Sequence, residues 1–169
     1  MKIFIPENIK KQCWEYLSKN SLANRGKADG NKNEQFVGLV GEILTKKVFG
    51  IKHKFEKGYD GGFDFQYKNK RIDVKTMSRT VDMKDHYVHN FIAYQKDYNC
   101  DAYIFNSINK KTNTLTICGW VTKEELKDKS SFYKKGTIRE RTDGSTFAMK
   151  TDTYEIKNNM LNNIKDLWG

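Results

Sequence analysis

The sequence predicts a mixed α/β (α+β) domain, in which helices and strands follow one another along the chain. Residues 63–76 alternate apolar and polar side chains with a period of two, which is typical of half-buried strands. Residues 34–49 instead repeat their apolar side chains at helical spacing. With 169 residues, the chain is long enough to bury the core of one domain, so we expect a single domain over residues 1–169.

Two helices are predicted before the strands begin. The first starts at Pro6, because proline favours the first turn of a helix, and it is followed by a polar loop over residues 21–33. The second runs over residues 34–49 and ends at Gly50. Gly38 and Gly41 lie inside it and destabilise a helix by about 1 kcal/mol each relative to alanine. We expect the close approach of a neighbouring element to compensate for them.

The segment 63–76 predicts a tight β-hairpin with its turn at Lys68 and Asn69. This register places all the apolar side chains on one face, whereas a three-residue turn would mix polar and apolar side chains on both faces. The pairs that we expect are Tyr67 with Lys70, Phe65 with Ile72, Phe63 with Val74, Asp64 with Asp73, and Gly62 with Lys75.

The polar face of this hairpin carries two carboxylates and a lysine. Directly paired, Asp64 and Asp73 would have Cβ atoms about 4.5–5.5 Å apart, and like charges so placed are destabilising. A divalent cation would relieve the repulsion, since Mg²⁺ prefers hard oxygen ligands such as carboxylates. Lys75 projects to the same face. The alternative is a solvated hairpin face with a structural ion pair from Lys75 to either aspartate.

The remaining elements are predicted from shorter patterns. The box formed by Thr122 and Glu125 predicts a helix start at Lys123. We expect strands at 51–56, 87–92, 101–108, 114–121 and 147–156, helices at 93–99, 123–132 and 158–167, a basic loop at 134–141 and a turn at Asp143-Gly144.

The charge of the chain indicates a polyanionic partner, either nucleic acid or an acidic membrane surface. Lys and Arg outnumber Asp and Glu by 31 to 21, which gives a formal net charge of +10. The densest basic cluster is Lys134, Lys135, Arg139 and Arg141, and the basic residues at the hairpin tip, Arg71, Lys68 and Lys70, are alternative contacts.

Several classes of protein are disfavoured by the sequence. The cysteines at 13, 100 and 118 form no C-x-x-C pair, which argues against a zinc knuckle or redox motif. We find neither an apolar run of about 18 residues nor the apolar region of a signal peptide. We therefore expect a cytoplasmic protein without a membrane partner, and its composition would suit a phage or mobile element.

An acidic helix residue, then an aspartate, then an Asp-x-Lys strand resembles the PD-(D/E)XK nucleases of the restriction-endonuclease-like superfamily. The matching residues are Glu42 after Gly41, Asp64 in Phe63-Asp64-Phe65, and Asp73-Val74-Lys75. No proline precedes Asp64. Asp60 competes with Asp64 for the first aspartate position, and Glu34 competes with Glu42 for the helix position.

The resemblance implies an αβββαβ core over about residues 34–121: a central mixed sheet flanked by helices, extended by an N-terminal helix and a C-terminal strand and helix. It also implies that Asp64, Asp73 and the Val74 carbonyl hold Mg²⁺, for which Mn²⁺ would substitute, with Glu42 ligating directly or through water. Lys75 would orient the attacking water or stabilise the transition state.

The implied function is a DNA endonuclease that leaves 5′-phosphate and 3′-hydroxyl ends, with RNA as an alternative substrate. A homodimer would supply two active sites for cleavage of both strands. The competing hypothesis is a nuclease-fold module that binds nucleic acid without cleaving it.

Overall fold

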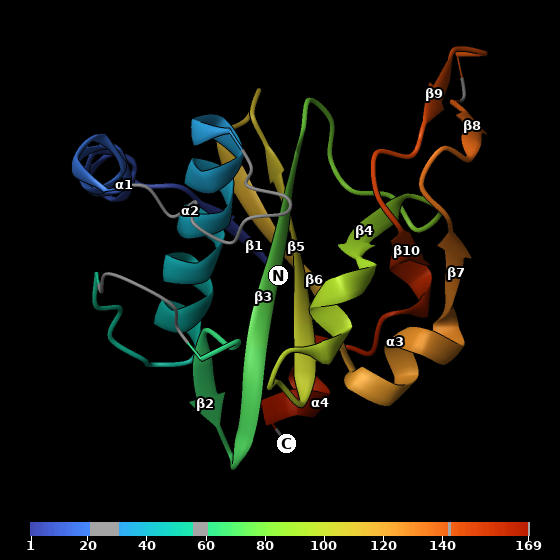
Figure 1. The fold of residues 1–169 in the computed structure, drawn as a ribbon. Helices are drawn as coiled ribbons and strands as arrows, with labels where there is room; N and C mark the ends of the chain where they lie inside the picture. The colour runs from blue at the N-terminus through green and yellow to red at the C-terminus, as the bar shows by residue number, and fades with distance from the viewer. Residues whose placement is uncertain (21–30, 56–60, 142, 169) are drawn as a thin grey trace.

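A five-stranded mixed sheet forms the centre of the computed structural model, which describes residues 1–20, 31–55, 61–141 and 143–168 (Figure 1). The strand order is β1-β6-β5-β3-β2. β3 pairs with β5 in parallel, and the other neighbouring strands pair antiparallel. The predicted mixed α/β class with a central mixed sheet is confirmed.

The strands of this sheet are β1 (Lys2–Phe4), β2 (Phe65–Tyr67), β3 (Lys70–Arg79), β5 (Ala102–Asn109) and β6 (Thr114–Thr122). The predicted strands 101–108 and 114–121 correspond to β5 and β6. β5 is buried along its whole length. Its first half, Ala102 to Phe105, is an apolar run, as expected of a strand covered on both faces, whereas its second half also buries Asn106, Ser107 and Asn109.

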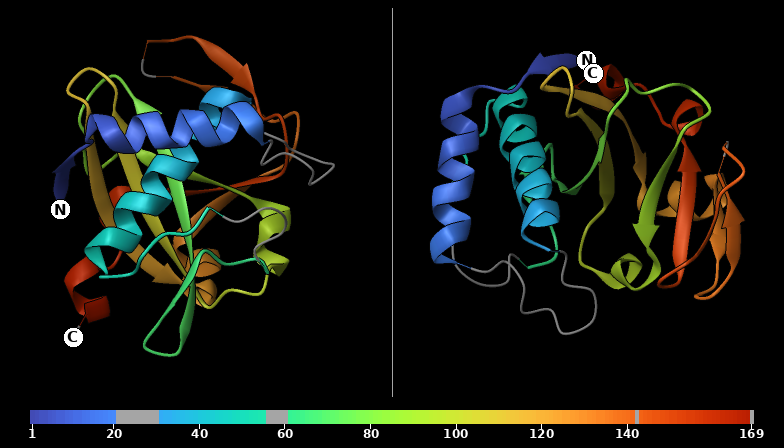
Figure 2. Two further views of the ribbon diagram at one scale, coloured as in Figure 1. Left: turned by 90° about the vertical axis from the view of Figure 1, so that its left-hand side faces the viewer. Right: turned by 90° about the horizontal axis from the view of Figure 1, so that it is seen from above.

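Two helices cover one face of the sheet. α2 (Lys32–Val48) packs directly against β3, and α1 (Glu7–Lys19) packs on α2, as Figures 1 and 2 show. The apolar stripe of α2 therefore faces the sheet and α1 together. The core of this layer includes Leu17, Val40, Leu44, Ile72, Val74 and Ile104.

A second, smaller sheet covers the other face, where the resemblance predicted helices. Its strands are β4 (Val88–Ile92), β10 (Thr153–Lys157) and β7 (Ser130–Tyr133), in the order β4-β10-β7, with α3 (Lys123–Lys129) beside it (Figure 1). The core between the two sheets includes Phe91, Tyr103, Phe105, Val121 and Ile156. The flanking of the central sheet by helices is thus confirmed for one face, and the other face differs.

Several predicted elements in the second half are corrected. The helix expected over 123–132 ends at Lys129, and the strand expected over 147–156 divides into β9 (Thr146–Ala148) and β10. The expected loop 134–141 contains β8 (Ile138–Glu140), which pairs with β9. Strand β7 forms because it pairs with the distant β10, which local patterns do not report, whereas β8 and β9 form a short local hairpin around the predicted turn at 143–144.

Shorter elements differ in type. The helix expected over 93–99 is a 3₁₀ turn, η1 (Ala93–Asp97), and the closing helix is η2 (Asn158–Met160) followed by α4 (Ile164–Trp168). The described part of the segment 51–56 forms no strand. None of the helices within the described ranges is long and apolar enough to cross a membrane.

One buried side chain in the second sheet carries a prediction about stability. His89 of β4 is 1% exposed, and its ring Nε2 lies 3.2 Å from Asn158 Oδ1. Burial lowers the pKa of His89 from 6.5 to about 4, and repulsion from Arg79 acts in the same direction. The unfolded chain therefore binds a proton at a higher pH than the folded chain does.

We expect this histidine to lower the free energy of unfolding by about 2 kcal/mol between pH 7 and pH 5. The loss begins as the pH falls below the unfolded pKa and is complete below the folded pKa. Urea titrations at several pH values measure it. His89→Gln, which retains a donor and an acceptor without titrating, should flatten this slope, whereas the exposed His86→Gln should not. An unchanged slope in His89→Gln would contradict the assignment.

Candidate active site

The hairpin turn forms as predicted. Lys68 and Asn69 have φ angles of 45° and 61°, and positive φ at both central residues is the signature of a type I′ turn. Phe65 pairs with Ile72 and Tyr67 with Lys70. The predicted two-residue turn and the register next to it are confirmed.

The ladder does not continue to the aspartates, which corrects the predicted pairing. Its last pair is Phe65 with Ile72, and the backbone N–H of Asp64 also donates to the Ile72 carbonyl, at 2.8 Å. Gly61 and Gly62 have φ angles of 81° and 88°, so the chain bends as it enters the hairpin. The predicted pairs of Asp64 with Asp73, Phe63 with Val74 and Gly62 with Lys75 are therefore wrong.

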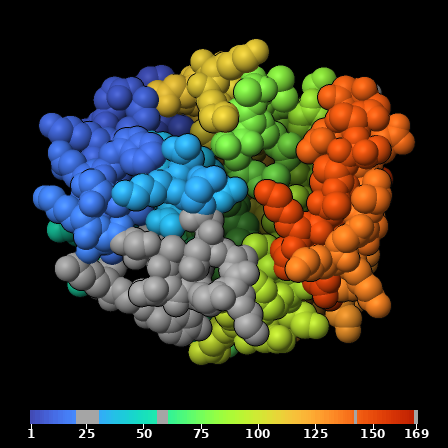
Figure 3. All heavy atoms as spheres, turned by 45° about the horizontal axis from the view of Figure 1, so that its top comes forward, coloured from blue at the N-terminus to red at the C-terminus, as the bar shows by residue number. Residues whose placement is uncertain are grey.

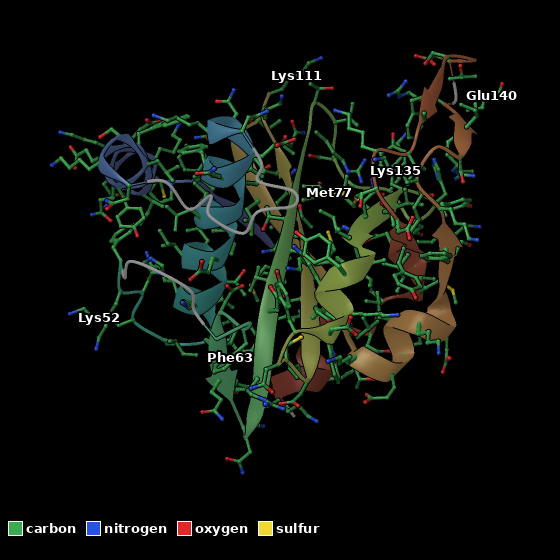
Figure 4. The ribbon with its side chains drawn as sticks, viewed as in Figure 1. Lys52, Phe63, Met77, Lys111, Lys135 and Glu140 are labelled. Atoms are coloured by element: carbon green, nitrogen blue, oxygen red, sulfur yellow. The ribbon has the colours of Figure 1, made fainter. Side chains whose placement is uncertain are left out.

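Phe63 shows the consequence of this bend. It packs against the core between the two sheets, whereas Phe65 and Val74 lie in the core beneath α2. The three apolar side chains thus do not share one face. In Figure 4, Phe63 lies at the foot of α2, close to the start of the hairpin.

Asp64 nevertheless contacts β3, the strand of Asp73 and Lys75, through its side chain. The Val74 N–H donates to Asp64 Oδ2 at 2.6 Å. The side chain keeps some solvent exposure, but its carboxyl lies deep among protein atoms. Burial raises the pKa of Asp64 well above its usual range; the charges of Asp73 and Glu42 add to this, and Lys75 opposes it. Asp64 is therefore an electrostatic neighbour of all three other candidates.

Asp73 and Lys75 form an ion pair on β3. Lys75 Nζ lies 2.7 Å from Asp73 Oδ2, and the two side chains are 18% and 8% exposed. The ammonium also lies 5.7 Å from the centre of the Phe91 ring, within range of a cation–π contact. Both side chains are partly withdrawn from water, where charge interactions are stronger than at the surface.

Glu42 of α2 is held by two further side chains. Lys46 Nζ lies 2.5 Å from Glu42 Oε1, and His53 Nδ1 lies 3.3 Å from the same oxygen. Burial alone would raise the pKa of Glu42, but the contacts of His53 and Lys46 outweigh burial and lower it. Neither Lys46 nor His53 was a predicted site residue.

Glu34, the alternative to Glu42 for the acidic helix position, caps the start of α2. Glu34 accepts a hydrogen bond from the Asn31 backbone N–H at 2.9 Å, and the Asn31 side chain accepts one from the Glu34 N–H at 3.0 Å. This is a reciprocal capping box, which assigns Glu34 to the helix terminus. Asp60, the rival of Asp64, lies outside the described residues.

The glycines of α2 have different surroundings. A Cβ added to Gly41 would lie 1.9 Å from Thr76 Oγ1, so α2 approaches β3 at this point as closely as glycine allows. The buried Asn106 amide donates to Thr45 Oγ1 at 2.8 Å and further anchors α2 to β5. A Cβ added to Gly38 would meet no described atom within 4 Å. The predicted close approach is confirmed for Gly41, and at Gly38 none of the described residues makes such an approach.

The acidic side chains of the candidate site supply only some of the ligands that a hard cation such as Mg²⁺ needs. No group of three or more His, Cys, Asp or Glu side chains with a metal-binding arrangement is found among the described residues. Mg²⁺ characteristically uses one or two carboxylates and completes its shell with water and phosphate oxygens. Asp64 and Asp73 fit that smaller requirement; the pKa of Asp64 is raised mainly by its burial and further by the charge of Asp73.

The predicted nucleic-acid contacts divide into two places. Arg71 lies near the hairpin tip, where its Nη2 is 2.6 Å from Asp101 Oδ1 and its Nε is 2.9 Å from Oδ2. Arg139 and Arg141 stack over the rings of Tyr133 and Phe147 at 4.0 and 4.4 Å. Arg139 also pairs with the buried Glu155 at 2.9 Å, so part of its role is structural.

The exposed Lys134 and Lys135 lie in the same C-terminal region as these two arginines. Figure 3 shows a hollow bordered by α2 on one side and by this region, coloured orange, on the other. In Figure 4, the labelled Met77 lies beside β3, and the labelled Lys135 lies to its right in the C-terminal region. In Figure 3, green atoms, in the colour range that includes β3, are seen within this hollow.

Neither a family model, a curated protein nor a solved structure matches this chain. The functional argument therefore depends on the residues and on their arrangement.

Proposed function

We propose that this protein is a metal-dependent endonuclease that hydrolyses phosphodiester bonds in DNA and leaves 5′-phosphate and 3′-hydroxyl ends. The observation that carries the proposal is the convergence of Glu42, Asp64, Asp73 and Lys75 from α2 and the hairpin. The four side chains interact electrostatically in a region that is partly shielded from water. Clusters of this kind, with strongly perturbed pKa values, are common at functional sites. The resemblance to PD-(D/E)XK nucleases supplies the reaction.

In this proposal Asp64 and Asp73 hold Mg²⁺ or Mn²⁺, with the Val74 carbonyl and Glu42 as the further ligands that the resemblance implies. When bound, the ion would lower the pKa of a water molecule and neutralise charge on the scissile phosphate. Burial is the main cause of the raised pKa of Asp64, and the charges of Asp73 and Glu42 add to it; a bound cation would offset that repulsion.

Lys75 acts on the substrate in the proposed reaction. Its ammonium is fixed by Asp73 at 2.7 Å and is only 18% exposed, so little reorganisation is needed to orient water or to stabilise charge on the phosphate. Asp73 therefore has two roles: it would bind the cation and it holds Lys75 in place.

The basic C-terminal region would contact the DNA backbone on the far side of the hollow. Lys134, Lys135 and Arg141 are exposed, and Arg141 is oriented by the Phe147 ring. Contacts of this kind release counterions, so binding should weaken steeply as the salt concentration rises.

A nuclease-fold module that binds without cleaving is the second candidate. The observation in its favour is that the described residues contain no three-residue group able to hold a metal ion. A carboxylate pair beside a desolvated lysine favours cleavage, because repelling acidic groups would weaken the binding of DNA phosphates.

Supercoiled plasmid incubated with the protein separates the two candidates. We expect nicked and linear products with Mg²⁺ and with Mn²⁺, none with EDTA, and nicks that DNA ligase reseals, since resealing requires 5′-phosphate and 3′-hydroxyl ends. Gel-shift binding to the same DNA without cleavage in either metal would refute the endonuclease and favour the binding module.

A further inference from the structure

Lys46 is a charged residue within the buried, mainly apolar part of α2. The residue is 9% exposed, among the buried residues Ile43, Leu44 and Thr45 of the same helix. Its ammonium lies 2.5 Å from Glu42 Oε1, one helical turn earlier. Side chains four residues apart meet on one helix face, so the pair is local in origin.

His53 approaches the same carboxylate oxygen from a different part of the chain. It follows α2, its side chain is 10% exposed, and Nδ1 lies 3.3 Å from Glu42 Oε1. Its ring stands edge-on to Phe55 with the ring centres 4.7 Å apart, which fixes its orientation. Nδ1 lies at ion-pair distance from Glu42 but outside good hydrogen-bond angles, and Nε2 has no hydrogen-bond partner among the described residues, so Glu42 is the polar neighbour of this ring.

Stability alone does not explain this arrangement. Replacement of a buried ion pair by apolar residues of similar volume is often neutral or stabilising, because the desolvation of both charges offsets their attraction. An apolar pair at positions 42 and 46 would thus fold at least as well. What the charged cluster provides is a carboxylate fixed in place next to Asp64, whose pKa responds to it.

We propose that Lys46 and His53 are positioning residues, which hold the Glu42 carboxylate in the orientation that the active site requires. The inference rests on the proposed endonuclease function. Two groups from separate segments contact one oxygen, and together they restrict rotation of the Glu42 side chain. Lys46 also balances the charge of Glu42 beside Asp64 and Asp73. Neither Lys46 nor His53 touches the reacting atoms in this role.

A double-mutant cycle between Glu42 and Lys46 tests the proposal, since residues that act as one unit have non-additive effects. The variants are Glu42→Gln, Lys46→Met and the combination. Lys47→Met is the matched control, because Lys47 neighbours Lys46 on α2 but is exposed. Each is assayed for single-turnover cleavage, for DNA affinity in EDTA and for melting temperature, with His53→Gln as a test of the second contact.

We expect Lys46→Met to reduce the cleavage rate about 10- to 100-fold with unchanged DNA affinity, as is typical for a partner that orients a metal-site residue. The double variant should be no slower than Glu42→Gln alone. Lys46→Met should lower the melting temperature by about 5 °C or more, because it removes the ammonium that balances the largely buried charge of Glu42 and leaves the longer contact with His53, and the double variant should recover most of this loss. Lys47→Met should match the wild type.

Full activity in Lys46→Met would overturn the proposal, and so would additive losses in the double variant, which would mean that Lys46 acts independently of Glu42. The melting temperatures decide separately whether the two side chains act as a unit. Absence of cleavage by the wild-type protein would count against the proposed function, and the recovery of stability in the double variant would still report on the pair.

Discussion

Asp73→Asn is expected to reduce DNA cleavage by about 10³-fold or more, since loss of one well-placed electrostatic group alone removes about 10²–10³. The substitution keeps the shape of the side chain but removes its charge. It thereby removes a carboxylate from the proposed cation site and the ion pair that fixes Lys75 at 2.7 Å. Single-turnover cleavage of a labelled duplex with saturating Mg²⁺ measures the effect.

The stability of Asp73→Asn should change little, because two effects oppose each other. Loss of the ion pair with Lys75 is unfavourable, whereas the repulsion that helps to raise the pKa of Asp64 disappears. We expect a melting temperature within a few degrees of the wild type. Asp128→Asn on the exposed surface of α3 is the matched control and should cleave normally. A fully active Asp73→Asn protein would remove Asp73 from the site.

Gly41→Ala is expected to destabilise the protein by about 3 kcal/mol, at the upper end of what overpacking causes. The new Cβ would lie 1.9 Å from Thr76 Oγ1 and 2.8 Å from Thr76 Cβ, so α2 must move away from β3. Because Glu42 and Lys75 adjoin these two residues in the chain, cleavage should fall as well. Urea unfolding and the nicking assay measure the two effects.

Gly38→Ala in the same helix is the matched control for this substitution. Its Cβ would meet no described atom within 4 Å, so the gain in helix propensity of about 1 kcal/mol should appear as added stability. Thr76→Ala removes the nearest clashing atom and should restore part of the stability of Gly41→Ala. Equal effects of alanine at 38 and 41 would contradict the close contact of α2 with β3.

The hairpin shows how far local sequence determines the structure. Its turn and the pairs Phe65–Ile72 and Tyr67–Lys70 follow from alternating apolar residues and from Asn69, which tolerates positive φ. The register beyond Phe65 was predicted wrongly because the alternation was extended through Gly61-Gly62. Two adjacent glycines were the available signal for a bend at that point.

For the other residues of the candidate site, some signals were present in the sequence and others were absent. The sequence Asn31-x-x-Glu34 is a visible capping box, which accounts for Glu34 as a residue of the helix start. Lys46 lies four residues after Glu42, a spacing that places the two side chains together on a helix. His53 had no such signal, because it lies in an irregular segment that only the folded chain brings to Glu42. In the second sheet, the predicted strands 87–92 and 147–156 contain β4 and most of β10, whereas β7 was expected to be part of a helix, since it depends on β10, a partner distant in sequence.

The central claim is that the carboxylates of Asp64 and Asp73 bind one divalent cation. Crystals grown with Mn²⁺, and measured at a wavelength where Mn²⁺ scatters anomalously, test it most directly. The account predicts an anomalous peak in contact with both carboxylates, which disappears in Asp73→Asn. No peak there at saturating Mn²⁺, or a peak that survives Asp73→Asn unchanged, would contradict it.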